Sequence, residues 1–218
     1  MSARHPLFLI AGLVLALNAT ALRAGPVEDA VTEVQHEWEV TRYQTPPKER
    51  EKRYEALVAK AHQYSEANPG RSEPLVWEGI VVSSLAGEKG GLGALGLVKQ
   101  AKGLYEQAIK IKPEALDGSA YNSLGVLYYK VPGWPIGFGD KKKADELMQS
   151  ALKLNPKGID PNFFYGEFLL EQKRPADALP YLERALQAPA RPGRQIADAG
   201  RRDEARELVE KARAQLAR

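Results

Sequence analysis

Small and large apolar residues alternate at fixed helical spacings in three successive segments of the chain. In each, a small residue is followed by a large one at the fourth position and a small one at the seventh, and a proline stands at the twelfth in the first two. The three series are Ala101, Tyr105, Ala108, Pro113; Ala144, Met148, Ala151, Pro156; and Ala178, Leu182, Ala185, with Pro189 near the expected place. These intervals put the side chains on one helix face, and proline cannot continue a helix. The pattern therefore predicts three helices with similar packing faces.

An apolar segment rich in aromatic residues precedes each of these predicted helices. The three segments are WEGIV (77–81), YNSLGVLYY (121–129) and FFYGEFLL (163–170). A first helix and a second helix are thus expected to alternate three times. The alanines of the second helix allow close approach, and its large residue fills the space between neighbouring units.

Apolar stripes at helical spacing continue before the repeated region. The stripe from Pro26 to about Tyr43 predicts a helix that the Pro46-Pro47 pair stops. Another stripe, from Tyr54 to Tyr64, predicts a helix that ends at Asn68-Pro69. Two helices are therefore expected ahead of the repeats.

The C-terminal segment repeats the second-helix pattern once more. Ala205, Val209 and Ala212 have the expected spacing, but the irregular run APARPGRQIADA (188–199) stands where a first helix would lie. We interpret this segment as a degenerate fourth unit whose last helix caps the stack, because a terminal unit otherwise exposes its apolar face.

The ordered series of small, large, small and proline residues resembles the tetratricopeptide repeat (TPR) family, whose unit is two antiparallel helices over about 34 residues. The resemblance implies an all-α, right-handed solenoid of helix pairs with a concave face formed largely by the first helices. It divides the chain into N-terminal helices (25–70), three TPR-like pairs (71–190) and a loop with a capping helix (191–218). The aromatic residues expected near the concave face or the adjacent core are Trp77, Tyr121, Tyr128 and Phe164.

Two of the three units are longer than the resemblance implies. The family pattern puts 12 residues between the glycine-like position of the first helix and the first alanine of the second, as from Gly166 to Ala178. The corresponding separation is 20 from Val81 to Ala101 and 19 from Gly125 to Ala144. Two extended inter-helix loops are therefore expected near each other on one edge of the stack.

The first extension contains G-x-G-x-x-G at 91–96, the fingerprint of a dinucleotide-binding turn. That turn works only between a strand and a helix. Here a helix is expected on both sides, around Trp77 and around Ala101. The sequence therefore predicts a structural turn, with no cofactor.

The second extension, VPGWPIGFGDKKKAD (131–145), offers Trp134, Ile136 and Phe138 between prolines and glycines. One interpretation is a hydrophobic contact surface for a partner or ligand. The other is that Trp134 and Phe138 fold back onto their own helices. Asp140 is expected to cap a helix that starts at Lys141, with Lys141-Lys142-Lys143 as a solvated first turn.

Four arginines surround the irregular segment near the C-terminus: Arg191, Arg194, Arg201 and Arg202. Arginine forks match carboxylates, so an acidic partner could dock there. Alternatively, these arginines tie the loop to nearby acids, with Asp198 and Asp203 as candidates, or remain hydrated. Both interpretations stay open on the sequence alone.

The first 24 residues have the pattern of a secretory signal peptide: Arg4 and His5, an apolar run over 7–17, then small residues. Cleavage is expected after Ala24 or Ala21; the alternative is an uncleaved anchor. Beyond it no apolar run is long enough to span a membrane. Residues 25–218 carry 29 basic against 28 acidic side chains, a net charge of +1 that makes nucleic acid an unexpected partner. The absence of cysteine excludes disulfides and thiolate metal sites.

No catalytic or metal-binding spacing is present. His36-Glu37 begins like a zinc-protease helix, but Val40 replaces the second histidine, and His62 stands alone. We therefore expect a non-enzymatic protein.

The expected function is that of an exported TPR-type scaffold that binds a protein partner. Candidate interaction residues are Trp134, Ile136, Phe138, Tyr128, Trp77, Arg191 and Arg194. The long extensions and the runs LYEQAIKIKP and ADELMQSALKLNPKG also resemble the T component of tripartite ATP-independent periplasmic (TRAP) transport systems. That looser resemblance implies a periplasmic helper that oligomerises around a pore and binds a small apolar ligand. The partner and the oligomeric state stay open.

Overall fold

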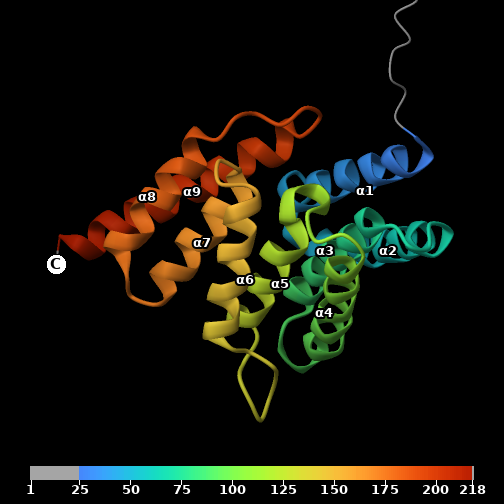
Figure 1. The fold of residues 1–218 in the computed structure, drawn as a ribbon, viewed down its shortest axis with the longest axis horizontal. Helices are drawn as coiled ribbons and strands as arrows, with labels where there is room; N and C mark the ends of the chain where they lie inside the picture. Colours follow the sequence, from blue (N-terminus) through green and yellow to red (C-terminus); the bar gives the residue numbers. More distant parts are fainter. Residues whose placement is uncertain (1–24, 218) are drawn as a thin grey trace, which may run out of the picture.

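The computed structural model describes residues 25–217, and every regular element in this part of the chain is helical (Figure 1). Residues 1–24, which include the predicted signal peptide and both cleavage sites, lie outside the described residues. The α-helices are α1 (Pro26–Tyr43), α2 (Pro47–Ala67), α3 (Ser72–Lys89), α4 (Ala94–Ile111), α5 (Ser119–Lys130), α6 (Lys141–Leu154), α7 (Ile159–Glu171), α8 (Pro175–Gln187) and α9 (Gln195–Leu216). Two 3₁₀ turns, η1 (Gly91–Gly93) and η2 (Ala115–Gly118), flank α4. None of the described helices has the length and apolarity that a membrane span requires.

The predicted helix pairs are confirmed as α3/α4, α5/α6 and α7/α8. Each pair is locked by a glycine of the first helix that faces the large residue of the second. These contacts are Gly79 with Tyr105, Gly125 with Met148, and Gly166 with Leu182. A Cβ atom at any of the three glycines would lie 2.6–2.7 Å from the facing side chain, so only glycine allows the close approach.

One alignment made from the sequence is wrong. The sequence comparison assigns Val81 to the glycine-like position of the first unit, whereas the structure places Gly79 there, against the Tyr105 ring. Val81 instead belongs to the core cluster formed with α1 and α2. The first extension is therefore two residues longer than the sequence comparison indicates.

The N-terminal helix has the predicted bounds, and the predicted N-cap of α6 is present. α1 runs from Pro26 to Tyr43, as predicted. Asp140 caps α6, because its side chain accepts hydrogen bonds from the backbone N–H groups of Lys142 and Lys143 at 2.9 and 3.0 Å.

The C-terminal helix differs from its prediction. α9 begins at Gln195, so only residues 188–194 of the predicted irregular segment are non-helical. α9 packs against α7 and α8 on one side and against α1 on the other. Gly200 makes this second contact possible: a Cβ atom there would lie 2.3 Å from the Tyr43 ring. The last helix therefore also bridges the two ends of the stack.

Both extended connections lie on the same edge of the stack, as predicted (Figure 1). The glycine motif 91–96 forms η1 and the first residues of α4, so the prediction of a helix on each side is confirmed. The second extension, residues 131–140, projects beyond the ends of α5 and α6.

Candidate functional site

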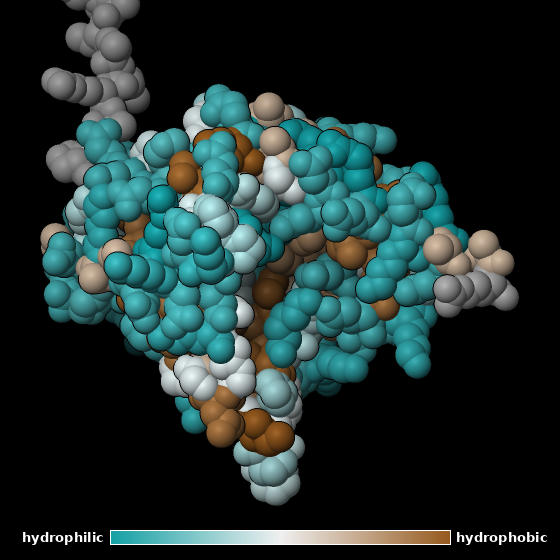
Figure 2. Space-filling model, turned by 180° about the vertical axis from the view of Figure 1, so that it is seen from behind, coloured by the Kyte–Doolittle hydropathy of each residue, from teal (hydrophilic) through white to brown (hydrophobic). Residues whose placement is uncertain are grey.

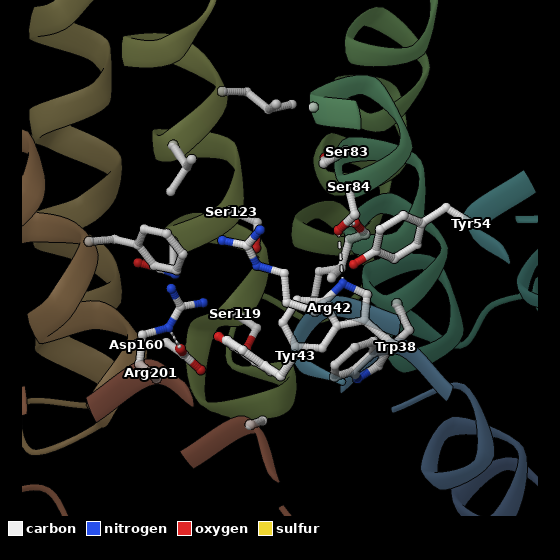
Figure 3. A pocket seen from close by; sticks show the side chains of 18 of the residues that line it. Trp38, Arg42, Tyr43, Tyr54, Ser83, Ser84, Ser119, Ser123, Asp160 and Arg201 are labelled. Carbon is white, nitrogen blue, oxygen red and sulfur yellow. Dashed lines mark hydrogen bonds and ion pairs between the residues drawn. The ribbon is translucent and has the colours of Figure 1, made fainter. Parts of the chain in front are cut away.

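A cavity of about 380 Å³ lies on the inner side of the stack, where α1 and α9 meet the first helices α3, α5 and α7. Figure 3 shows its lining. α1 contributes Trp38, Arg42 and Tyr43, and serine hydroxyls come from α3 and α5. The apolar part of its wall includes Trp77, Phe164 and Val126. Its volume lies within the range of about 300–1,000 Å³ that is common for ligand pockets.

Four buried polar atoms have no hydrogen-bond partner within the described residues, and all four belong to residues that line this cavity. They are the Tyr54 hydroxyl, Trp77 Nε1, Asn122 Oδ1 and Arg194 Nε. Buried polar groups are normally paired, because an unpaired one costs about 1–3 kcal/mol. The residues around this cavity therefore keep hydrogen-bonding capacity that the described part of the chain does not use.

Asp160 organises the arginine side of the cavity. This residue lies in the first turn of α7 and accepts hydrogen bonds from Arg191 Nη1 at 2.6 Å and Arg201 Nε at 3.0 Å. Burial by itself would raise the pKa of Asp160, but the positive charges of Arg191 and Arg201 outweigh it and hold the pKa well below its ordinary value. Asp160 is therefore ionised throughout the physiological range.

Each arginine bound to Asp160 also has a second acid. Arg191 Nε donates to Asp198 Oδ1 at 2.7 Å, and Arg201 Nη1 donates to Glu204 Oε2 at 2.6 Å. The other Glu204 oxygen accepts a hydrogen bond from Arg42 of α1 at 2.8 Å. The network thus joins α7, the loop 188–194 and α9 to α1, and it holds the two ends of the stack around the cavity.

Arg194 is the most weakly neutralised cation of the cavity wall. Its Nε atom lies 3.5 Å from Glu39 Oε2, which already accepts a 3.0 Å hydrogen bond from the backbone N–H of Ala197. Its guanidinium stacks 5.0 Å from the centroid of Trp77. Burial, and then the nearby charge of Arg191, lower the pKa of Arg194. This guanidinium therefore has capacity for an additional acceptor.

The structure brings together three of the seven candidate interaction residues, Trp77, Arg191 and Arg194, and also places Phe164 and Arg201 in the same wall. Arg191 has the predicted partner Asp198, whereas Asp203 pairs with Arg206. Binding of the arginines to acids within the chain is thus the observed arrangement. Arg202 donates to the backbone carbonyl of Ala188 at 2.9 Å.

The other four candidate interaction residues lie in or beside the second extended connection and do not line the cavity: Tyr128, Trp134, Ile136 and Phe138. Phe138 folds back, with its ring 5.4 Å from Tyr128 in an edge-to-face arrangement. Trp134 and Ile136 keep 90% and 60% of their surface exposed. Each interpretation of this loop is therefore correct for part of it. Phe138 folds back, whereas Trp134 and Ile136 form an exposed apolar surface.

Several cavity residues were missed from the sequence. Trp38 and Tyr54 were seen only as members of apolar helical stripes, and Asn122 and Asp160 carried no motif. His36 and His62, considered as metal ligands, pair with Glu39 and Glu78 at 3.3 and 2.9 Å. Among residues 25–217, no group of three or more histidine or acidic side chains is arranged to hold a metal ion.

No protein-family model matches the sequence, and no curated protein matches it significantly. Among solved structures, the chain is similar to TTC0263, a thermophilic TPR protein of Thermus thermophilus. The TM-score is 0.57 and the identity 19%, over 87% of this chain and 91% of that one. The chain has a TPR-like fold.

Two structures of MamA show weaker likeness, one of them from AMB-1. Their identities are 19% and 18% with TM-scores of 0.45 and 0.48, over 78% and 88% of this chain and 93% and 98% of theirs. These likenesses concern the TPR-like fold alone. The resemblance to the TRAP T component receives no support from them and stays a prediction.

Proposed function

We propose that the protein is an exported, non-enzymatic scaffold that binds a segment of a partner protein in the cavity on its concave face. The observation that carries this proposal is the set of four unpaired polar atoms around one cavity. A TPR-like stack supplies a concave surface, and function on such a scaffold depends on the site that it presents.

The chemistry of the cavity favours a segment with an apolar side chain and exposed carbonyl or carboxylate oxygens. Tyr54 OH, Trp77 Nε1 and Arg194 Nε can all donate, whereas Asn122 Oδ1 can only accept. The aromatic wall provides apolar contact area. A backbone carbonyl or a carboxylate would satisfy the donors, and a backbone N–H would satisfy Asn122.

A small ligand is the alternative, and the contact between α1 and α9 beside the cavity favours it. The unpaired polar atoms would then require a ligand with polar groups as well as an apolar body. The small ligand that the sequence analysis expected to be apolar would therefore also have to carry polar groups.

One crosslinking experiment separates the two candidates. A photoreactive benzoylphenylalanine replaces Phe164, which lines the cavity, and in a matched variant it replaces Tyr181 of α8, which does not. Both rings have an arginine stacked over them at 4.3–4.4 Å. After irradiation in cells, we expect one discrete protein adduct from position 164 and none from position 181.

The adduct also reports on the polar contacts and on export. Arg194→Ala should reduce its yield about tenfold, because a hydrogen bond to a charged group contributes roughly 1.5–3 kcal/mol, whereas Arg206→Ala should not. A small-mass adduct would favour the alternative, and equal adducts at positions 164 and 181 would contradict the cavity. Mass spectrometry of the same protein should show a chain that begins at Gly25 or Leu22.

A further inference from the structure

Three large apolar side chains are exposed on the edge that carries both extended connections. Leu92 of η1 keeps 84% of its surface exposed, and Trp134 and Ile136 are the exposed apolar residues of the second connection. The two connections share this edge because α3/α4 and α5/α6 are antiparallel pairs stacked in the same direction (Figure 1). Figure 2 shows hydrophobic residues gathered on the projection at this edge. We call residues 89–102 and 130–143 the extended edge.

The projecting loop is held in shape by its own backbone. Gly139 N–H donates to Pro132 O at 2.9 Å, and Asp140 N–H donates to Tyr128 O at 2.8 Å. A Cβ atom at Gly137 would lie 2.5 Å from Pro132 O, so the two sides of the loop meet there as closely as the backbone allows. The packing of Phe138 against Tyr128 closes the base. These contacts of the loop therefore hold Trp134 in its exposed position.

The extended edge concentrates positive charge. Its two segments contain seven lysines and one acid, Asp140, although residues 25–218 as a whole carry a net charge of only +1. Four of these lysines are bound within the protein: Lys89 and Lys130 pair with glutamates of α2 and α7, and Lys102 and Lys143 pair with glutamates one turn further along their own helices. Lys99, Lys141 and Lys142 are exposed and make no ion pair with any described residue. In the sequence, Lys99 follows Leu92, and Lys141 and Lys142 follow Trp134 and Ile136.

From this arrangement we infer that the extended edge binds the surface of an anionic phospholipid membrane. Tryptophan favours the headgroup region because its ring is largely apolar, while its N–H can stay hydrated there. Isoleucine and leucine tips enter the acyl boundary, while lysines behind them approach lipid phosphates. Protein interfaces are depleted of lysine, so the same charge would oppose a protein partner. The cavity is lined by other residues and stays available.

The test is cosedimentation with vesicles of phosphatidylcholine alone or with about 30% phosphatidylglycerol, using the chain from Gly25. The four apolar clusters of the structure are formed within residues 25–217, and the apolar run 7–17 would itself bind lipid. We expect binding to the anionic vesicles, weakened between about 50 and 300 mM salt by screening. Tryptophan emission should shift to the blue when Trp134 enters the lipid. This change can be assigned to Trp134 because Trp38 and Trp77 are already buried.

Matched variants assign the effect to the edge. Trp134→Ala should abolish the blue shift and weaken vesicle binding about tenfold, whereas Leu216→Ala, at the exposed end of α9, should leave both unchanged. The double variant Lys141→Glu/Lys142→Glu should weaken binding to anionic vesicles tenfold or more, since each basic residue contributes about 1 kcal/mol; Lys211→Glu should not.

Circular dichroism confirms that each variant is folded. The inference is overturned if the chain from Gly25 does not bind anionic vesicles, or if the edge variants bind as well as the controls. It is also overturned if Trp134 is required only for association with a protein in lipid-free solution.

Discussion

Tyr105→Ala is expected to lower the free energy of unfolding by about 3–5 kcal/mol, the cost of removing a large buried ring and leaving a cavity. Tyr105 is almost fully buried; its ring fills the notch at Gly79, and its hydroxyl forms a 3.0 Å hydrogen bond with Ser83. Tyr105→Phe removes only the hydroxyl and should cost about 1 kcal/mol. Urea unfolding followed by circular dichroism measures both values.

The contact between Gly79 and Tyr105 can be tested by a change of sign. Gly79→Ala in the natural background should be destabilising, because the added Cβ atom would lie 2.6 Å from the Tyr105 ring. In the Tyr105→Ala background the same change should stabilise the protein, by up to about 1 kcal/mol, through better helix propensity. If Gly79→Ala has the same effect in both backgrounds, the pairing that defines the repeat is wrong.

Asp160→Asn is expected to lower the free energy of unfolding by about 2–3 kcal/mol at pH 7. Breaking a buried ion pair typically costs about 3–5 kcal/mol, and the Asp160 side chain keeps 30% of its surface exposed, which reduces the effect. Asp203→Asn is the control, since Asp203 and Arg206 form an exposed pair whose loss should cost less than about 1 kcal/mol.

The destabilisation should depend on pH in a defined direction. The folded-state pKa of Asp160 is below its ordinary value, so this carboxylate contributes stability above pH ~4 that is lost as the pH falls toward the folded-state pKa. The difference between the natural chain and Asp160→Asn should therefore shrink steadily below pH ~4. A difference that is constant from about pH 7 to pH 2 would mean that the charge of Asp160 has no role.

The repeat could be read from the sequence because its packing is local. Tyr105, Met148 and Leu182 each contact a glycine of the helix just before, and the same spacing returns three times. The misplacement of Val81 shows the limit of this approach. In the extended first unit the sequence pattern indicated Val81, and only the contact with Tyr105 shows that Gly79 holds this position.

The cavity could not be predicted because its parts are distant in sequence. The hydrogen bond between Arg42 and Glu204 spans 162 positions, and the contact of α9 with α1 depends on Gly200, which no repeat pattern distinguishes. The loop tip was undecided for another reason. Trp134 and Phe138 are chemically alike, and only the position of Tyr128 beside Phe138 separates the residue that folds back from the one that is exposed.

The most direct test of the proposed cavity function is the ¹H–¹⁵N spectrum of the three tryptophan indole groups. Trp38 Nε1 donates to Ser84 Oγ at 2.8 Å, Trp77 Nε1 has no partner among the described residues, and Trp134 lies outside the cavity. Addition of the molecule captured through position 164 should shift the Trp77 signal strongly and leave the Trp134 signal in place. A Trp77 signal that does not move at saturation would contradict binding in the cavity.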